Sequence, residues 1–160
     1  VLLDGKHDLK TSEKITTIVV STVFEKLAEA KAYLPGLILK TSMVINGNQN
    51  TDEASPTEVA EATARMLKKS VPNEVGGVVF LSGGQTAVEA TAHLDAIAEQ
   101  GPLPWEIAFS YARALQESAL KIWAGKDENV ASAREEFMKR LKLNKLADEG
   151  KYDIALEYLD

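Results

Sequence analysis

Three short apolar runs, separated by segments with helical periodicity, constrain the fold of this chain more than any other feature. The runs lie at residues 36–44, 76–81 and 105–110, and Gly or Pro residues bound them. Strands that alternate with helices of a dozen or more residues are joined by crossover connections, which place the strands in parallel. The sequence therefore predicts an α/β fold built from parallel βα units.

The helical segments are set by local signals. Residues 11–32 carry apolar side chains at helical spacing, at Ile15, Ile18, Val19, Val23 and Leu27. The β-branched segment 15–23 makes a strand the competing assignment, but length and periodicity favour a helix. Ser55 with Glu58, and Thr86 with Glu89, have the spacing of capping boxes and predict helices that run to about residues 70 and 99. Two further helices are predicted at 111–125 and 127–150, followed by a short tail at 151–160.

Lys40 interrupts the first apolar run. With a period of two, Ile38 and Lys40 share one face of this strand, while Leu39 and Thr41 share the other. We expect both faces to be covered, as in parallel sheets. A lysine in such a strand needs an ion partner, a path to water or a lowered pKa, and the last makes an amine nucleophile for carbonyl substrates. Taken alone, a lysine that reaches solvent at the strand end is the simpler interpretation.

Small and basic residues follow the next two predicted strands. Ser82-Gly83-Gly84 precedes a helix, and Ser110 and Arg113 follow the third strand. Unhindered backbone N–H groups near a helix start, with an arginine beside them, are suited to a phosphate group. Each part also has a simpler interpretation, because the glycines suit a tight turn and Arg113 suits a solvated helix. Together with Lys40, they predict a sugar-phosphate or keto-phosphate substrate.

Composition excludes several other functions. The net charge of −6 and the pI near 5.0 argue against nucleic acid or an anionic membrane as a partner. The chain has no cysteine and only two histidines, His7 and His93, far apart in the sequence, so we expect neither a metal nor another cofactor. No apolar run reaches transmembrane length. The missing cysteines fit a reducing compartment, and we expect a cytoplasmic protein.

The remaining conspicuous side chains have structural interpretations. We expect His7 to lie in a polar loop and His93 on a helix surface. Three aromatic residues are expected to pack between the sheet and the helices: Trp105, Trp123 and Phe137. The charge-rich run Glu135, Glu136, Lys139 and Arg140 is expected to be a solvated helix face.

Three motifs carry a resemblance to a known family. Residues 39–44 (LKTSMV), 80–85 (FLSGGQ) and 109–115 (FSYARAL) resemble signatures of class I fructose-bisphosphate aldolase. The resemblance covers essentially the whole chain. It implies a (β/α)8 TIM barrel of which residues 1–160 form the C-terminal part of a single domain, contributing strands 6–8 with their flanking helices.

The resemblance also implies a site and a reaction. Lys40 matches the Schiff-base lysine, and the substrate phosphate site matches Ser82, Gly83, Gly84, Ser110, Ala112 and Arg113. The family cleaves fructose 1,6-bisphosphate reversibly to dihydroxyacetone phosphate and glyceraldehyde 3-phosphate without metal, in glycolysis and gluconeogenesis. A homotetramer is the assembly that the resemblance implies.

Departures from the family pattern limit what this chain is expected to do alone. Thr41-Ser42 replaces the usual residues after the lysine, Ala112 stands where glycine is common, and a role for Tyr158 in substrate closure is doubtful. The first five strands, with the family's acid/base carboxylates, are expected to lie outside these 160 residues. We therefore expect the isolated chain to be inactive unless the N-terminal half complements it. The alternatives are a non-catalytic phosphate-binding or interaction fragment and, with a poorer match to the motifs, a transaldolase-like barrel.

Overall fold

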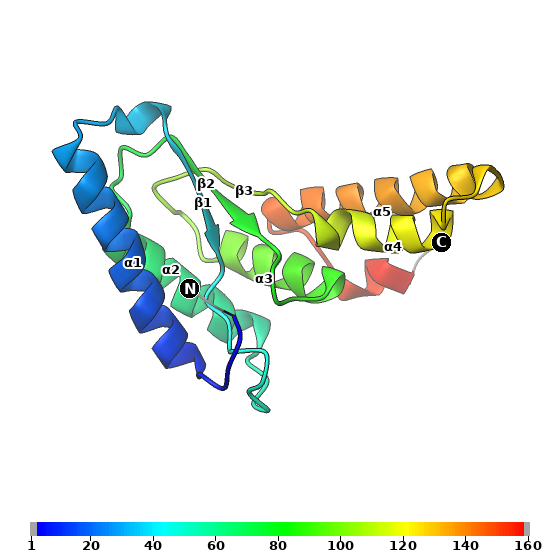
Figure 1. Cartoon of the computed structure of the whole chain (residues 1–160), viewed down its shortest axis with the longest axis horizontal. Helices are drawn as coiled ribbons and strands as arrows, with labels where there is room; N and C mark the ends of the chain where they lie inside the picture. Colours follow the sequence, from blue (N-terminus) through cyan, green and yellow to red (C-terminus); the bar gives the residue numbers. More distant parts are fainter. Residues whose placement is uncertain (1–2, 159–160) are drawn as a thin grey trace.

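A computed structural model describes residues 3–158, which form one parallel three-stranded sheet with flanking helices (Figure 1). The strands β1 (Ile38–Ser42), β2 (Gly77–Leu81) and β3 (Ile107–Phe109) lie in the order β1-β2-β3. The helices are α1 (Leu9–Glu29), α2 (Pro56–Ser70), α3 (Ala87–Glu99), α4 (Arg113–Trp123) and α5 (Val130–Asp148). Three 3-10 helices are η1 (Leu34–Gly36), η2 (Asp127–Asn129) and η3 (Ile154–Tyr158). The predicted element order and the parallel α/β architecture are confirmed.

The helix starts are fixed by their first side chains. The Asp8 carboxylate accepts a hydrogen bond from the Thr11 N–H at the start of α1. Both predicted capping boxes are present, since Ser55 and Glu58 bond reciprocally at α2 and Thr86 and Glu89 do so at α3. Each box satisfies two backbone donors that a helix start otherwise leaves unpaired. No helix within residues 3–158 has both the length and the apolar character needed to cross a membrane.

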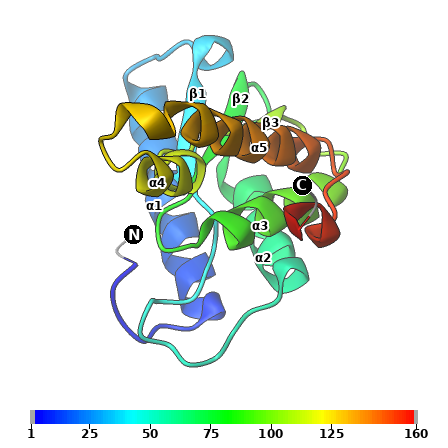
Figure 2. The same cartoon turned by 90° about the vertical axis from the view of Figure 1, so that its right-hand side faces the viewer.

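The core lies between one face of the sheet and the helices that cover it. Val78 and Phe80 of β2 point into this core and are fully buried, as are Met66 and Leu67 of α2. Helices α1, α2 and α3 contact one another in sequence order, and α5 then packs on α3 and α4 (Figures 1 and 2). The opposite face of the sheet is left open in this part of the chain.

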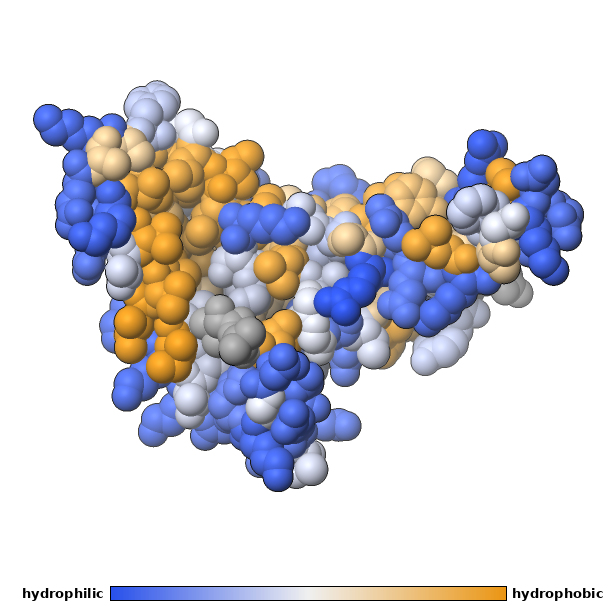
Figure 3. Space-filling view, viewed as in Figure 1, coloured by the Kyte–Doolittle hydropathy of each residue, from blue (hydrophilic) through white to orange (hydrophobic). Residues whose placement is uncertain are grey.

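The predicted helix at 11–32 is present as α1, and most of its apolar stripe is exposed. Its buried side chains are Ser12, Thr16, Val20 and Phe24, whereas Ile15, Ile18, Val19 and Val23 are 40–52% exposed. Helix α2 covers the first set, and apolar side chains gather along α1 and over the neighbouring sheet (Figure 3). The stripe is exposed because the described residues provide no element on its other side.

The expectation that the first strand is covered on both faces is wrong. Ile38 of β1 is 65% exposed and Lys40 is exposed on the same face, while Thr41 on the other face is buried. An apolar strand face without cover is typical of a surface that another element packs against.

Several individual side chains differ from their expected positions. Arg140 is buried at 3% exposure instead of solvated, and His93 is buried instead of lying on a helix surface. Trp105 is buried as predicted, and its indole N–H donates to the Pro72 carbonyl at 2.8 Å. Trp123 is 41% exposed because α4 and α5 extend away from the sheet (Figure 1).

Candidate active site at the strand ends

Lys40 lies on the open face of the sheet and reaches across it. The register pairs Lys40 with Val79 of β2 and Val79 with Ala108 of β3, so these three residues form one row. The Lys40 ammonium donates a hydrogen bond to the Ser110 hydroxyl at 3.0 Å. The sequence left three outcomes open for Lys40: an ion partner, a path to water or a lowered pKa. In the structure its ammonium reaches water and has a hydroxyl partner.

Ser110 is placed by the end of β3. Its N–H donates to the Phe80 carbonyl at 2.8 Å, which extends the parallel pairing one residue beyond the strand. The sequence motif assigns Ser110 to the phosphate site, whereas the structure brings its hydroxyl to Lys40. No local signal gives this contact, because the two residues are 70 positions apart.

Tyr111 anchors the segment that carries Ser110 and was missed by the sequence analysis. Its side chain is buried, its hydroxyl donates to the Ala90 carbonyl at 3.0 Å, and its ring lies 5.7 Å from that of Phe109. Burial raises the pKa of the Tyr111 hydroxyl well above its usual range, so this group stays a hydrogen-bond donor. The alternation of aromatic and small residues at 109–111 is the sequence pattern that could have indicated a buried Tyr111.

The loop after β2 makes a tight turn. The Gln85 N–H donates to the Ser82 carbonyl at 3.3 Å, and Ser82 is buried. Gly84 has φ +77°, and a Cβ there would lie 3.0 Å from Leu3 Cδ1, so both conformation and space favour glycine. A Cβ on Gly83 would lie 3.2 Å from Leu81 Cδ1. The interpretation that these glycines are required by a tight turn is therefore correct. The same turn leaves their backbone N–H groups unhindered, which suits an anion.

Arg113 lies beside this loop at the start of α4. The position of a Cβ on Gly83 is 3.8 Å from Arg113 Nη2, so the guanidinium stands next to the glycine backbone. Ala112 is the residue before the helix, with φ −101°, and its methyl group is compatible with that backbone conformation. No side chain caps the start of α4, so the helix offers backbone N–H groups as well as Arg113 to an anion.

His93 supports the same loop from α3. It is 8% exposed, and its Nδ1 lies 2.7 Å from the Gln85 Oε1. Burial lowers the pKa of the imidazole, and the nearby Glu89 carboxylate only partly opposes this. The neutral ring can therefore donate from Nδ1 to Gln85. The expectation that His93 lies on a helix surface is wrong, because the ring is buried against the loop that follows β2.

The lowered pKa of His93 predicts a pH-dependent stability. Below the ordinary histidine value of about 6.5, the unfolded chain binds a proton that the folded chain does not. The free energy of unfolding should therefore decrease as pH falls from 7 toward 5.5, with a slope from His93 of at most about 1.4 kcal/mol per pH unit. His93→Gln should flatten this part of the urea-denaturation profile, and an unchanged slope would contradict the assignment.

Together, these residues form an amine beside an anion cradle. The turn at 82–84 and Arg113 follow the C-terminal ends of neighbouring parallel strands, where ligands bind in such folds, and Lys40, in the middle of β1, reaches this region through its contact with Ser110. Within residues 3–158, no three His, Asp or Glu side chains converge as metal ligands. The side chains present are suited to carbonyl and phosphate groups.

Comparisons with known proteins identify the family. The family model described as fructose-bisphosphate aldolase class-I matches residues 1–158. Fructose-bisphosphate aldolase 2, chloroplastic, of Pisum sativum is 47% identical over 152 residues, covering 95% of this chain and 43% of that protein. The Drosophila melanogaster fructose-bisphosphate aldolase is 47% identical over 154 residues, covering 95% of this chain and 42% of that protein.

A solved structure agrees with these relatives. The fructose-bisphosphate aldolase from Plasmodium falciparum, in complex with TRAP and a small molecule inhibitor, superposes with a TM-score of 0.92 at 45% identity. The superposition covers 95% of this chain and 44% of that one. The chain thus spans less than half the length of the relatives that it matches. On this evidence, it belongs to the class I fructose-bisphosphate aldolase family.

Proposed function

We propose that this chain supplies the Schiff-base half of an aldolase active site. The observations that carry the proposal are the hydrogen bond from the Lys40 amine to Ser110 and the position of the Arg113 guanidinium beside Gly83. In the proposed reaction the unprotonated amine attacks the ketone of fructose 1,6-bisphosphate and water leaves, giving an iminium. The carbon–carbon bond then breaks as its electron pair moves into the iminium.

Proton transfers complete the proposed cycle. The hydroxyl on the departing fragment loses a proton and becomes the aldehyde of glyceraldehyde 3-phosphate, while the enamine on Lys40 takes up a proton. Hydrolysis of the resulting iminium returns the amine and releases dihydroxyacetone phosphate. The residues described here offer the amine and the phosphate donors, and we assign the acid/base carboxylates to the other βα units of a complete barrel.

The exposed apolar surfaces of β1 and α1 support the proposal that further βα units are needed to complete the barrel. β1 is an edge strand of a parallel sheet, with Ile38 exposed, and the apolar stripe of α1 continues beside it (Figure 3). An open parallel edge with apolar flanks is unfavourable in water. We propose that a complementary set of βα units closes the barrel here, that the closed barrel assembles as a homotetramer, and that the isolated chain is inactive.

Reduction with borohydride in the presence of dihydroxyacetone phosphate tests the proposal. The sample is a chimera in which the part of the Drosophila aldolase that this chain does not match completes the barrel. We expect one adduct, on Lys40, by peptide mass spectrometry. Lys69→Arg, at an exposed lysine of α2, is the matched control and should keep the adduct. No adduct, or an adduct on another lysine, would refute the assignment.

A non-catalytic phosphate-binding fragment is the second candidate. It is favoured by the fact that the turn and Arg113 are both complete within the described residues, while Lys40 is exposed. Calorimetry separates the two: binding of a phosphate ligand that survives Lys40→Met, with no turnover in the completed barrel, supports this candidate.

A further inference from the structure

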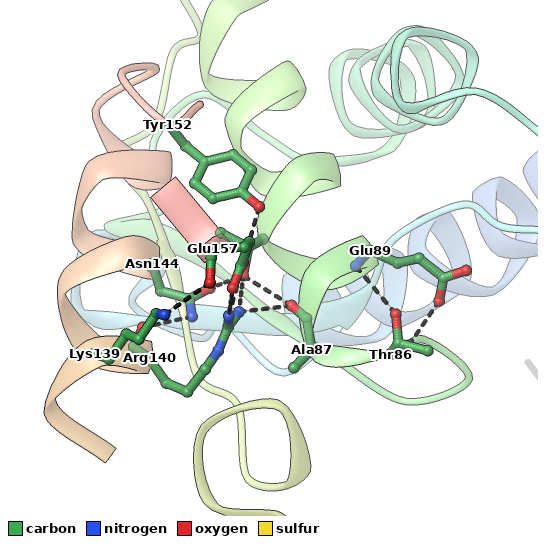
Figure 4. A network of polar contacts seen from close by, with 9 residues as sticks. Thr86, Ala87, Glu89, Lys139, Arg140, Asn144, Tyr152 and Glu157 are labelled. Atoms are coloured by element: carbon green, nitrogen blue, oxygen red, sulfur yellow. Dashed lines mark hydrogen bonds and ion pairs between the residues drawn. The ribbon is translucent and has the colours of Figure 1, made fainter. Parts of the chain in front are cut away.

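A buried ion pair joins the last segment of the described chain to α5. The Arg140 Nη1 donates to both carboxylate oxygens of Glu157, at 2.7 and 2.5 Å, and the two side chains are only 4% and 9% exposed (Figure 4). An ion pair out of water is favourable only when further hydrogen bonds satisfy its remaining groups. The partners of this pair therefore show what it organises.

The second Arg140 nitrogen reaches the first turns of α3. Nη2 donates to the Ala87 carbonyl at 2.9 Å and to the Thr91 hydroxyl at 2.5 Å. Asn144, one turn later on α5, accepts from the same Thr91 hydroxyl at 3.1 Å. Helix α3 is thus tied to α5 near its N-terminal end, in part through Ala87, the residue that directly follows the N-cap residue Thr86.

The C-terminal segment is fixed around Glu157. The Tyr152 hydroxyl donates to Glu157 Oε1 at 2.9 Å, and the Tyr152 N–H donates to the Asp95 carboxylate at 2.8 Å. Lys139 of α5 donates to the Glu157 carbonyl at 2.7 Å (Figure 4). Tyr152 and Glu157 therefore hold the two ends of this segment against the body of the chain, and the network contacts α3 at Ala87, Thr91 and Asp95, which lie on one face at a spacing of four.

The start of α3 is also the end of the phosphate loop. Only two residues separate Gly84 from Ala87, and the Thr86–Glu89 capping box and the Gln85–His93 contact connect the loop rigidly to the helix. A shift of α3 relative to β2 would therefore move Gly83 and Gly84 away from Arg113. Displacements of about 1 Å in a binding site reduce function on the order of 10²-fold.

We propose that Arg140 and Glu157 act as a clamp through which the C-terminal segment positions the Ser82–Gln85 phosphate loop. Both are positioning residues, because neither lies at the turn or at Lys40. The proposal rests on the proposed function of that loop as a phosphate site. It gives the C-terminal segment a role in substrate binding without any contact to the substrate.

Hydrogen exchange with and without inorganic phosphate tests the clamp in the full 160-residue chain. In the Glu157→Gln variant, amide exchange at residues 82–90 should become about ten-fold faster, while exchange in α2 stays unchanged. The Kd for inorganic phosphate should rise about ten-fold. Glu157→Asp, which keeps the charge, should recover part of both effects. Glu149→Gln is the matched control, since Glu149 is paired with Lys145 of α5 at the surface, and it should change neither.

The outcomes are distinguishable. The clamp is overturned if amide exchange at residues 82–90 in Glu157→Gln equals that of the unsubstituted chain. It is also overturned if exchange accelerates equally in all helices and strands. If Glu157→Gln does not fold, Tyr152→Phe decides by the same exchange pattern, because it removes one hydrogen bond to Glu157 and uncovers no charge. Absence of phosphate-dependent protection in the unsubstituted chain refutes the phosphate site of the proposed function, while the exchange comparison still decides the clamp.

Discussion

Replacement of Lys40 by Arg in the completed barrel is expected to lower kcat for fructose 1,6-bisphosphate on the order of 10⁴-fold. Arginine keeps the positive charge and can still donate to the Ser110 hydroxyl. Its guanidinium is not deprotonated in proteins and cannot form the iminium. A loss of kcat in Lys40→Arg therefore reports the missing covalent step and not a missing positive charge. Coupled spectrophotometric assay of the glyceraldehyde 3-phosphate released provides the measurement.

Ser110→Ala is the matched comparison for Lys40. It removes the hydroxyl that accepts from the ammonium but leaves the amine in place. We expect a loss of roughly ten-fold, which corresponds to one hydrogen bond to a charged group. A Lys40→Arg variant with activity within ten-fold of the unsubstituted barrel would contradict the nucleophile assignment.

Arg140→Leu is expected to lower the free energy of unfolding by roughly 3–5 kcal/mol. The substitution leaves the Glu157 carboxylate, 9% exposed, without its cation, and it removes the donor to the Ala87 carbonyl. Against a total stability of about 5–15 kcal/mol for a typical domain, this is a large fraction. Urea denaturation followed by circular dichroism measures it.

Two variants show whether burial is the cause. The double variant Arg140→Leu/Glu157→Leu should recover much of the loss, because neither charge is then left buried. Lys145→Met removes an exposed lysine that pairs with Asp148 and Glu149 at the end of the same helix, and it should cost no more than about 1 kcal/mol. Equal effects of Arg140→Leu and Lys145→Met would show that the buried pair has no special role.

Much of the fold followed from short-range patterns. The capping boxes at Ser55 and Thr86 placed the starts of α2 and α3, and the three apolar runs placed the strand boundaries to within two residues. These signals are readable because a cap or a turn depends on residues within one turn of each other. The boundaries of β1 and β3 were less accurate than those of β2, because the predicted apolar runs extend beyond the residues that pair in the sheet.

The candidate site was only partly readable in the same way. Lys40 and the turn at Ser82 were singled out because a parallel sheet brings the C-terminal ends of its strands together, and their assignment to a substrate site stays a prediction. The contact between Lys40 and Ser110, and the anchoring role of Tyr111, had no short-range signal. His93 was misplaced because the period of a helix shows which residues share a face, but not what lies opposite that face.

The sequence by itself therefore determined the elements, their parallel order and the chemical groups at the strand ends. Tertiary structure decided which faces are covered: it buried Arg140 against Glu157 and left the apolar stripe of α1 and Ile38 exposed. Element formation depends on neighbours along the chain, whereas the free energy of burial depends on the groups that fold up opposite. For Arg140 the group opposite is in the chain, 17 residues away, and for α1 the described residues provide none.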